Sequence, residues 1–160
     1  MNVIFTCGGT GGHINPAIAV ANTWKQRHPD SKILFVGAVG GMEEQLVPKA
    51  GYELITLPGD GMYRDFSFSG IKKNVRTLKL LANAVNRCKK IIREFQADVV
   101  VGTGGYANLP ALMAAGLLKV PSCVHEANAV PGLTTKLAAL WTERNLVCFP
   151  QSAQYYKNKD

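Results

Sequence analysis

An alternation of short apolar runs with helix-like stretches is the feature that most constrains the fold of this 160-residue chain. The runs are rich in Val, Ile and Leu and lack the period-two alternation of half-exposed strands, which is typical of strands buried on both faces. They fall at residues 2–6, 32–37, 52–57, 97–102, 121–126 and 144–149. Helical crossovers between such strands predict an α/β fold with a doubly wound, mainly parallel, Rossmann-like sheet.

The length of the chain fits one domain, which we expect to span residues 1–160. Its longest mostly apolar run, residues 109–118, is well short of the ~20 residues that a membrane-spanning helix needs. The first residues are expected to form a strand and not a signal peptide, because no basic segment precedes a long apolar one. The four cysteines have no C-x-x-C spacing, which predicts buried free thiols, and Cys7 is expected to be structural.

Two similar glycine-rich segments follow predicted strands: GGTGGHINP at residues 8–16 and GTGGYANLP at residues 102–110. Each leads into a predicted helix, with Asn15 and Asn108 as candidate caps and Pro16 and Pro110 in the first turn. Free N–H groups at the start of such helices bind anions, and this fold binds ligands at the carboxyl ends of its strands. The two segments therefore predict an anion-binding site at that edge of the sheet.

Known nucleotide-binding motifs do not account for these segments. Neither has the lysine of a P-loop, and no acid follows the second strand until Glu43, unlike in dinucleotide-binding folds. His13 directly follows the first glycines, where it is a candidate general base. His125, Glu126 and Asn128 follow the fifth strand, where a His-Glu pair fits either a functional site or a simple strand-end hydrogen bond.

In chain order, G-G-T-G-G-H before a helix that starts with proline, G-x-G-G-Y, and H-E-x-N leading into VPGLTTKLAA resemble the amino-terminal half of the MurG family. These N-acetylglucosaminyltransferases act on lipid I, the undecaprenyl-pyrophosphoryl-muramoyl-pentapeptide precursor of peptidoglycan. The chain departs from the family at Ala127, where glutamine is common, and contains no counterpart of the family's carboxyl-terminal domain.

The resemblance implies the amino-terminal, acceptor-binding half of a GT-B glycosyltransferase. Such an enzyme moves N-acetylglucosamine from UDP-GlcNAc to the 4-hydroxyl of MurNAc in lipid I, with inversion, and forms lipid II. The implied site residues are the base His13, donor contacts at Thr10, Gly11, Gly12 and Asn128, and acceptor contacts at Gly104, Gly105, Tyr106, His125 and Glu126. No D-x-D motif is present for a metal-diphosphate clamp, so neither a metal nor a cofactor is expected.

The net charge of +7 arises from residues 63–95, which hold nine Lys or Arg and two acids, whereas the rest of the chain is balanced. A helix over residues 71–95 is predicted to turn one apolar face toward the core, made of Ile71, Val75, Leu78, Ala82, Val85 and Ile92. The opposite basic face, with apolar side chains nearby, favours docking on anionic lipid, although a solvated helix face is the plain alternative. The predicted membrane residues are Phe66, Phe68, Lys72, Lys73, Arg76 and Leu80.

Three functions stay open at this point. The first is the acceptor half of a transferase, peripheral on the cytoplasmic face of a bacterial membrane and inactive without its other domain. Its expected partners are UDP-GlcNAc, lipid I, an anionic membrane surface and the carboxyl-terminal domain. Nucleic acid is not expected, because no nucleic-acid-binding module is recognisable. The second is a non-catalytic membrane adaptor subunit of a split glycosyltransferase, and the third is an unrelated Rossmann enzyme that uses a nucleotide.

Overall fold

A single parallel sheet forms the centre of the molecule in the computed structural model, which describes residues 1–58 and 71–156, with only the helix backbone for 71–77. The strand order is β3-β2-β1-β4-β5-β6, and every pairing is parallel. The strands are β1 (Asn2–Thr6), β2 (Lys32–Ala38), β3 (Glu53–Leu57), β4 (Val99–Gly102), β5 (Ser122–Glu126) and β6 (Arg144–Val147). The predicted doubly wound α/β fold is confirmed, and strand order reverses between β1 and β4.

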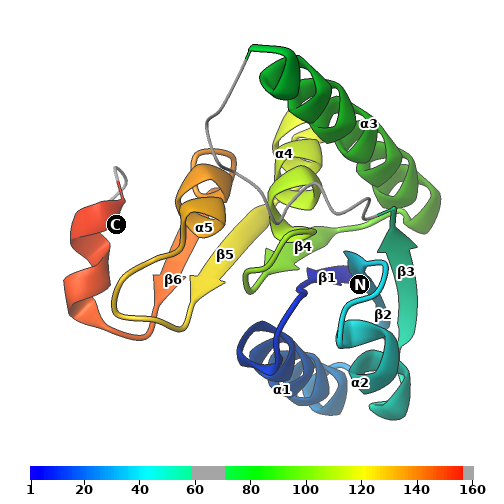
Figure 1. Cartoon of the computed structure of the whole chain (residues 1–160). Helices are drawn as coiled ribbons and strands as arrows, with labels where there is room; N and C mark the ends of the chain where they lie inside the picture. The colour runs from blue at the N-terminus through cyan, green and yellow to red at the C-terminus, as the bar shows by residue number, and fades with distance from the viewer. Residues whose placement is uncertain (59–70, 157–160) are drawn as a thin grey trace.

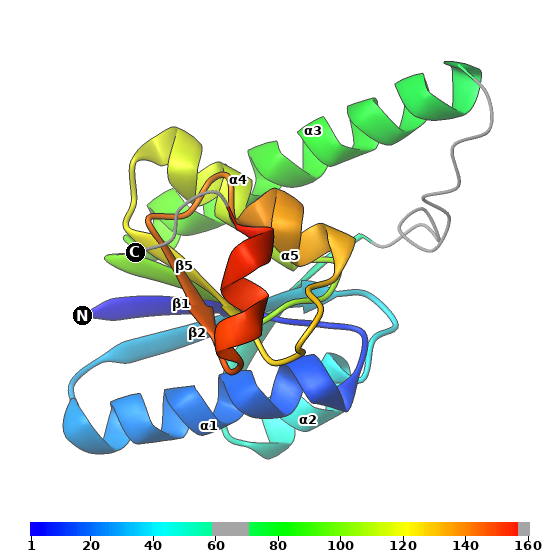
Figure 2. The same ribbon diagram turned by 90° about the vertical axis from the view of Figure 1, so that its left-hand side faces the viewer.

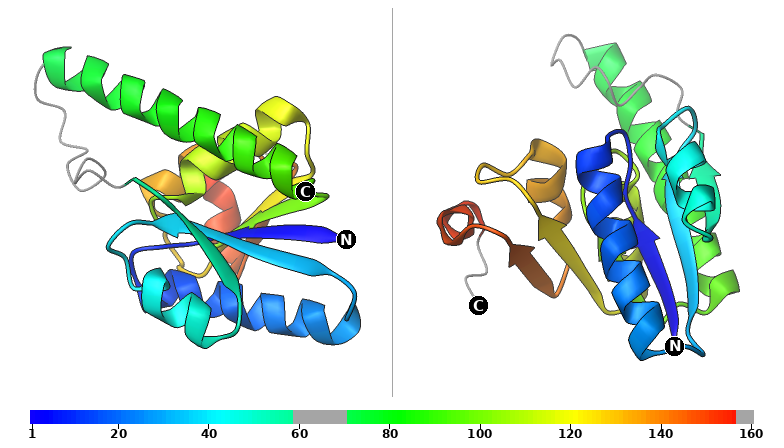
Figure 3. Two further views of the ribbon diagram at one scale, coloured as in Figure 1. Left: turned by 90° about the vertical axis from the view of Figure 1, so that its right-hand side faces the viewer. Right: turned by 90° about the horizontal axis from the view of Figure 1, so that it is seen from below.

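Helices cover both faces of the sheet, so the domain has three layers (Figures 1 and 2). One face carries α1 (Gly11–Arg27) and α2 (Glu43–Lys49). The other face carries α3 (Ile71–Phe95), α4 (Asn108–Leu118) and α5 (Leu133–Ala138), and the 3-10 helix η1 (Pro150–Tyr155) follows β6. Figure 3 shows these layers from two further sides, with α3 lying across α4.

Side chains of the inner strands alternate between two separate cores. Phe5 of β1 stacks on Phe35 of β2, with ring centroids 5.4 Å apart, on the face covered by α1 and α2. Ile4 and Val100 belong to the core on the opposite face, together with residues of α3 and α4. Because both faces are covered, neither set of side chains could be polar, which explains the uninterrupted apolar runs in the sequence.

The helices after the glycine segments begin earlier than the sequence predicted. Helix α1 begins at Gly11, because the Thr10 carbonyl accepts the N–H groups of His13 (3.0 Å) and Ile14 (3.2 Å). Asn15 therefore lies inside the helix, and its predicted capping role is wrong. Asn108 is the first residue of α4 and not its cap, and its buried side-chain amide has no partner among the described residues.

The buried face of α3 is rotated from the one that the sequence predicted. Val85 and Ile92 are buried as expected, but Ala82 is exposed and Leu78 is 65% exposed. The buried face of the helix also includes residues that lie beside the predicted face: Leu81, Ala84, Cys88, Ile91 and Phe95. Figure 2 shows the first turns of α3 extending beyond α4 and α5.

Candidate active site

Two loops meet where the carboxyl ends of β1 and β4 lie side by side. We call residues 7–12 the first glycine loop and residues 103–107 the second glycine loop. The Thr103 N–H donates to the Thr6 carbonyl (3.0 Å), which continues the β1–β4 pairing into the second loop. Both loops then turn into the amino-termini of helices, α1 and α4, at the switch point where ligands bind in this fold.

The two loops interlock so closely that only glycine fits at their contact. A Cβ on Gly105 would overlap the Gly8 carbonyl, and a Cβ on Gly104 would overlap the His13 imidazole. Both residues also have positive φ values, +107° at Gly104 and +86° at Gly105, which glycine adopts without strain. These two glycines therefore serve loop-to-loop packing, which the sequence alone could not distinguish from contact with a ligand.

His13 is held at this contact by a reciprocal pair of hydrogen bonds with Thr103. The imidazole Nδ1 lies 3.0 Å from the Thr103 carbonyl oxygen, and the Thr103 hydroxyl donates to the His13 carbonyl (2.6 Å). A carbonyl oxygen can only accept, so Nδ1 carries the proton and the lone pair of the neutral ring lies on Nε2. The half-buried ring thus has the tautomer that a general base needs.

The start of α1 offers unpaired backbone donors beside His13. Among the described residues, the N–H groups of Gly11 and Gly12 have no hydrogen-bond acceptor. Thr10 and Gly12 are exposed, so this end of the helix is open to a ligand. Free N–H groups and the helix dipole together favour an anion at this position.

Glu43 is a buried residue of this region to which the sequence assigned no role. Its side chain is 0% exposed, and it reaches from the start of α2 to both neighbouring strand ends. Oε1 accepts the Ala38 N–H (2.9 Å) and Oε2 accepts the Gly9 N–H (3.1 Å). The carboxylate therefore ties the end of β2 to the first glycine loop.

The segment after β5 is organised by a second buried carboxylate. Glu126 is 2% exposed, and its Oε1 accepts the N–H (2.9 Å) and the Nδ2–H (2.8 Å) of Asn128. Its Oε2 accepts the Gly132 N–H (3.3 Å). In this geometry Glu126 shapes the loop from β5 to α5, whereas Asn128 is exposed at the loop surface.

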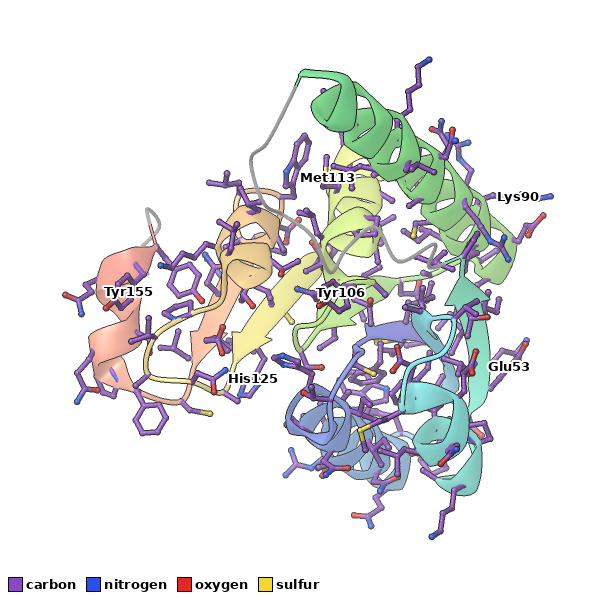
Figure 4. All side chains as sticks on the ribbon, viewed as in Figure 1. Glu53, Lys90, Tyr106, Met113, His125 and Tyr155 are labelled. Carbon is purple, nitrogen blue, oxygen red and sulfur yellow. The ribbon has the colours of Figure 1, made fainter. Side chains whose placement is uncertain are left out.

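His125 and Tyr106 lie at the same edge of the sheet, near the start of α1 (Figure 4). Both are half-buried. His125 Nε2 is 3.2 Å from the Cys148 thiol, and its buried Nδ1 has no partner in the part of the chain that the structure describes. His13, Tyr106 and His125 therefore come to this edge from three different segments, although His125 and Glu126 are the last two residues of β5 and do not follow it as the sequence predicted.

The four cysteines are free thiols, but their surroundings differ more than the sequence predicted. Cys7 and Cys88 are buried, and burial raises the pKa of each to about 12; at Cys7 the Glu43 carboxylate adds to this rise. Burial also raises the pKa of the half-buried Cys123. Cys148 is exposed, so the expectation of four buried thiols is wrong for this residue.

Of the six predicted membrane residues, the structure describes the side chain of Leu80 alone. Phe66 and Phe68 lie outside the described residues, as do the side chains of Lys72, Lys73 and Arg76 at the start of α3. Leu80 is half-buried, so it is not the exposed apolar side chain that the sequence suggested. Leu78, predicted to face the core, is the exposed leucine of this helix among its described side chains.

No group of three or more His, Cys, Asp or Glu side chains converges as a potential metal site within residues 1–58 and 78–156. The carboxylates of Glu43 and Glu126 are instead occupied by backbone and amide donors.

Comparison with known proteins identifies the family. The chain is 42% identical over 160 residues to the "UDP-N-acetylglucosamine--N-acetylmuramyl-(pentapeptide) pyrophosphoryl-undecaprenol N-acetylglucosamine transferase" of Carboxydothermus hydrogenoformans. It is 41% identical over 160 residues to the protein of that name from Alkaliphilus oremlandii. Both alignments cover all of this chain, which spans only 42% and 43% of the relatives' lengths.

The solved structure of Acinetobacter baumannii MurG is similar, with a TM-score of 0.78 and 26% sequence identity. That match covers 94% of this chain and 42% of the MurG chain, as expected for the amino-terminal half of a GT-B fold. Residues 3–147 match the glycosyltransferase family 28 N-terminal domain. The predicted resemblance is confirmed: the chain belongs to glycosyltransferase family 28 and carries the N-terminal domain of that family.

Proposed function

We propose that this chain is the acceptor-binding half of a glycosyltransferase that moves N-acetylglucosamine from UDP-N-acetylglucosamine to the MurNAc 4-hydroxyl of lipid I, forming lipid II. The names of its relatives support this reaction, and this chain corresponds to 42% of the length of one of them. The structural observation that carries the proposal is His13, held between the two glycine loops, with no partner for its Nε2 in the described part of the chain.

In this proposal His13 is the general base. Its Nε2 takes the proton from the acceptor 4-hydroxyl while that oxygen attacks the anomeric carbon of the donor sugar. The bond from this carbon to the UDP oxygen breaks in the same displacement, so the configuration inverts without a covalent intermediate. The hydrogen bond from Nδ1 to Thr103 keeps the ring in the required tautomer and orientation.

The remaining site residues bind the two substrates. The free N–H groups of Gly11 and Gly12, with Thr10, lie beside the pyrophosphate and the donor sugar. The second glycine loop, with Gly104, Gly105 and Tyr106, faces the acceptor together with His125. Asn128 contacts the donor from the loop after β5. Glu126 contributes to the acceptor site by shaping this loop through its hydrogen bonds to Asn128.

Mutation of His13 tests the proposal in the protein joined to a donor-binding domain, with a lipid I analogue as acceptor. His13→Ala is expected to lower turnover by about 10²–10⁴-fold, because a positioned base contributes that much, and to leave the KM for UDP-N-acetylglucosamine nearly unchanged. His28→Ala is the matched control, since His28 lies at the far end of α1, where its ring packs at a tilt against Trp24. A comparable loss of donor affinity in His13→Ala would show a structural role instead.

A non-catalytic membrane adaptor subunit of a split glycosyltransferase is the second candidate, and the observation that favours it is the exposed Leu78 beside the exposed Lys79 on α3. The same experiment separates the two functions. If the chain is an adaptor, the assembled complex retains full transferase activity when His13 is replaced. If His13 is the general base, the complex loses most of its activity. Transfer of N-acetylglucosamine by this chain alone would contradict both, since each function requires a separate donor-binding domain.

We also propose that the first turns of α3 dock on the anionic, cytoplasmic surface of the membrane that holds the lipid acceptor. Leu78 is 65% exposed there, and its neighbour Lys79 is exposed as well. This pairing of an apolar side chain with a cation suits an anionic lipid surface. Within the residues that the structure describes, no helix has the length and apolar character to cross a bilayer.

Sedimentation with anionic vesicles checks this surface. Leu78→Ser is expected to weaken vesicle binding by about 10- to 150-fold, because about 1.5–3 kcal/mol accompanies burial of a leucine side chain. Val20→Ser is the control, since Val20 is 46% exposed on α1, across the sheet from α3. Equal binding by the native chain and Leu78→Ser would exclude Leu78 from the docking surface.

A further inference from the structure

Glu43 lies at a junction that connects three parts of the candidate site. Its carboxylate is fully buried and accepts one N–H from the end of β2 and one from the first glycine loop, at Ala38 and Gly9. A buried carboxylate costs free energy unless such donors compensate it. Here each carboxylate oxygen has one backbone donor, so the side chain acts as a bridge between two segments.

The surrounding backbone is built to admit this carboxylate. A Cβ on Gly8 would lie 2.5 Å from Glu43 Oε1, and one on Gly37 would lie 2.6 Å from Glu43 Cγ. A Cβ on Gly41 would overlap the carboxylate itself. Any side chain at these positions would displace Glu43, so three glycines from the first loop, β2 and the turn before α2 make room for it.

We propose that Glu43 is a positioning residue that holds the first glycine loop in its ligand-binding form. It touches neither substrate. By fixing Gly9, it sets the course of the loop toward Gly11 and Gly12, whose N–H groups remain free, and toward His13. What the loop binds rests on the proposed function, but the positioning by Glu43 does not.

The direction in which Glu43→Gln changes the affinity for an anion separates a positioning role from a purely electrostatic one. A carboxylate near an anion-binding loop repels the anion, so charge removal alone should strengthen anion binding. Glu43→Gln removes the charge, but it also turns an amide NH₂ toward one of the two backbone N–H groups and so breaks one hydrogen bond. If Glu43 positions the loop, this substitution weakens anion binding despite the favourable change in charge.

Amide and imidazole NMR of this chain, with inorganic pyrophosphate as the probe, provides the test. We expect pyrophosphate to shift the Gly11 and Gly12 amide signals of the native chain. In Glu43→Gln we expect an affinity about tenfold lower, together with altered Gly9, Ala38 and His13 ring nitrogen signals. Glu44→Gln is the matched control, because Glu44 is exposed, adjacent in α2 and carries the same charge. It is expected to behave as the native chain does.

Each outcome decides a separate point. Unchanged His13 and Gly11 signals in Glu43→Gln, or tighter pyrophosphate binding, would overturn the positioning role. Absence of pyrophosphate binding by the native chain would overturn the anion site of the proposed function, and the ring and amide signals would still decide the role of Glu43. If Glu43→Gln does not fold, Glu43→Asp replaces it: this variant keeps the charge but shortens the bridge by one methylene, and native-like signals in it would contradict the proposal.

Discussion

At the scale of single residues, the four thiols offer a direct check on the structure. Cys148 is exposed, whereas Cys7 and Cys88 are buried and have raised pKa values of about 12. Iodoacetamide reacts with accessible thiolates, so in the folded chain it is expected to modify Cys148 first, and Cys123 more slowly. Peptide mass spectrometry after a timed reaction measures the order. Modification of Cys7 as fast as that of Cys148 would contradict the burial of Cys7.

The sequence predicted His13 correctly as a residue of the switch-point edge, because a histidine after glycines at a strand end has few structural roles. It could not predict the partner of that histidine, since Thr103 contributes a backbone carbonyl from a distant strand. Glu43 was missed for a related reason. In dinucleotide-binding folds the informative acid directly follows the second strand, whereas Glu43 folds back from α2 to bind backbone N–H groups. Its signal in the sequence was the cluster of glycines around it.

At the scale of elements, α3 shows what periodicity leaves undetermined. The spacing of apolar residues predicted a helix over residues 71–95 correctly. It could not fix the rotation of that helix, because several apolar stripes overlap on its surface and only contact with α4 selects one. The starts of α1 and α4 were predicted late for a similar reason. Proline marked the first turn in the sequence, but Pro16 lies inside α1 and Pro110 is the third residue of α4.

The rotation of α3 predicts opposite results for two substitutions in the same helix. Ile91 is 7% exposed in the core, so Ile91→Ala is expected to lower the free energy of unfolding by about 2–4 kcal/mol. Leu78 is 65% exposed, and Leu78→Ala is expected to change it by less than about 0.5 kcal/mol. Urea denaturation followed by circular dichroism measures both. An equal loss of unfolding free energy in the two variants, or a larger loss in Leu78→Ala, would support the buried face that the sequence predicted.

At the scale of the whole molecule, the order of the strands explains how distant segments form one site. The sequence indicated parallel strands, and the right-handed crossover rule with helices on both faces leaves few orders for six of them. The observed order brings the ends of β1 and β4 together although more than 90 residues separate them along the chain. The same fold buries the thiols of Cys7 and Cys88 and the ring of Tyr156, which has a consequence for stability at high pH.

Burial raises the pKa of Cys7 and Cys88 from 9.0 to about 12. Burial, with the Glu126 carboxylate as a second cause, raises the pKa of Tyr156 from 10.0 to about 12. Between pH 9 and pH 12 the native state therefore binds more protons than the unfolded state. Linkage then requires the free energy of unfolding to fall as pH rises through this window, and to be fully retained below pH 9 as far as these groups are concerned.

Removing one buried thiol isolates its share of this pH dependence. By pH 10, the ionisation of a single thiol in the unfolded chain, where its pKa is 9.0, costs about 1.4 kcal/mol of stability. Cys88→Ala is therefore expected to lose less stability between pH 8 and pH 10 than the native chain, although it is less stable at both pH values because a small cavity remains. The exposed Cys148 provides the control variant, Cys148→Ala. Urea denaturation at the two pH values measures the difference, and identical losses in Cys88→Ala and the native chain would mean that the Cys88 thiol titrates alike in both states.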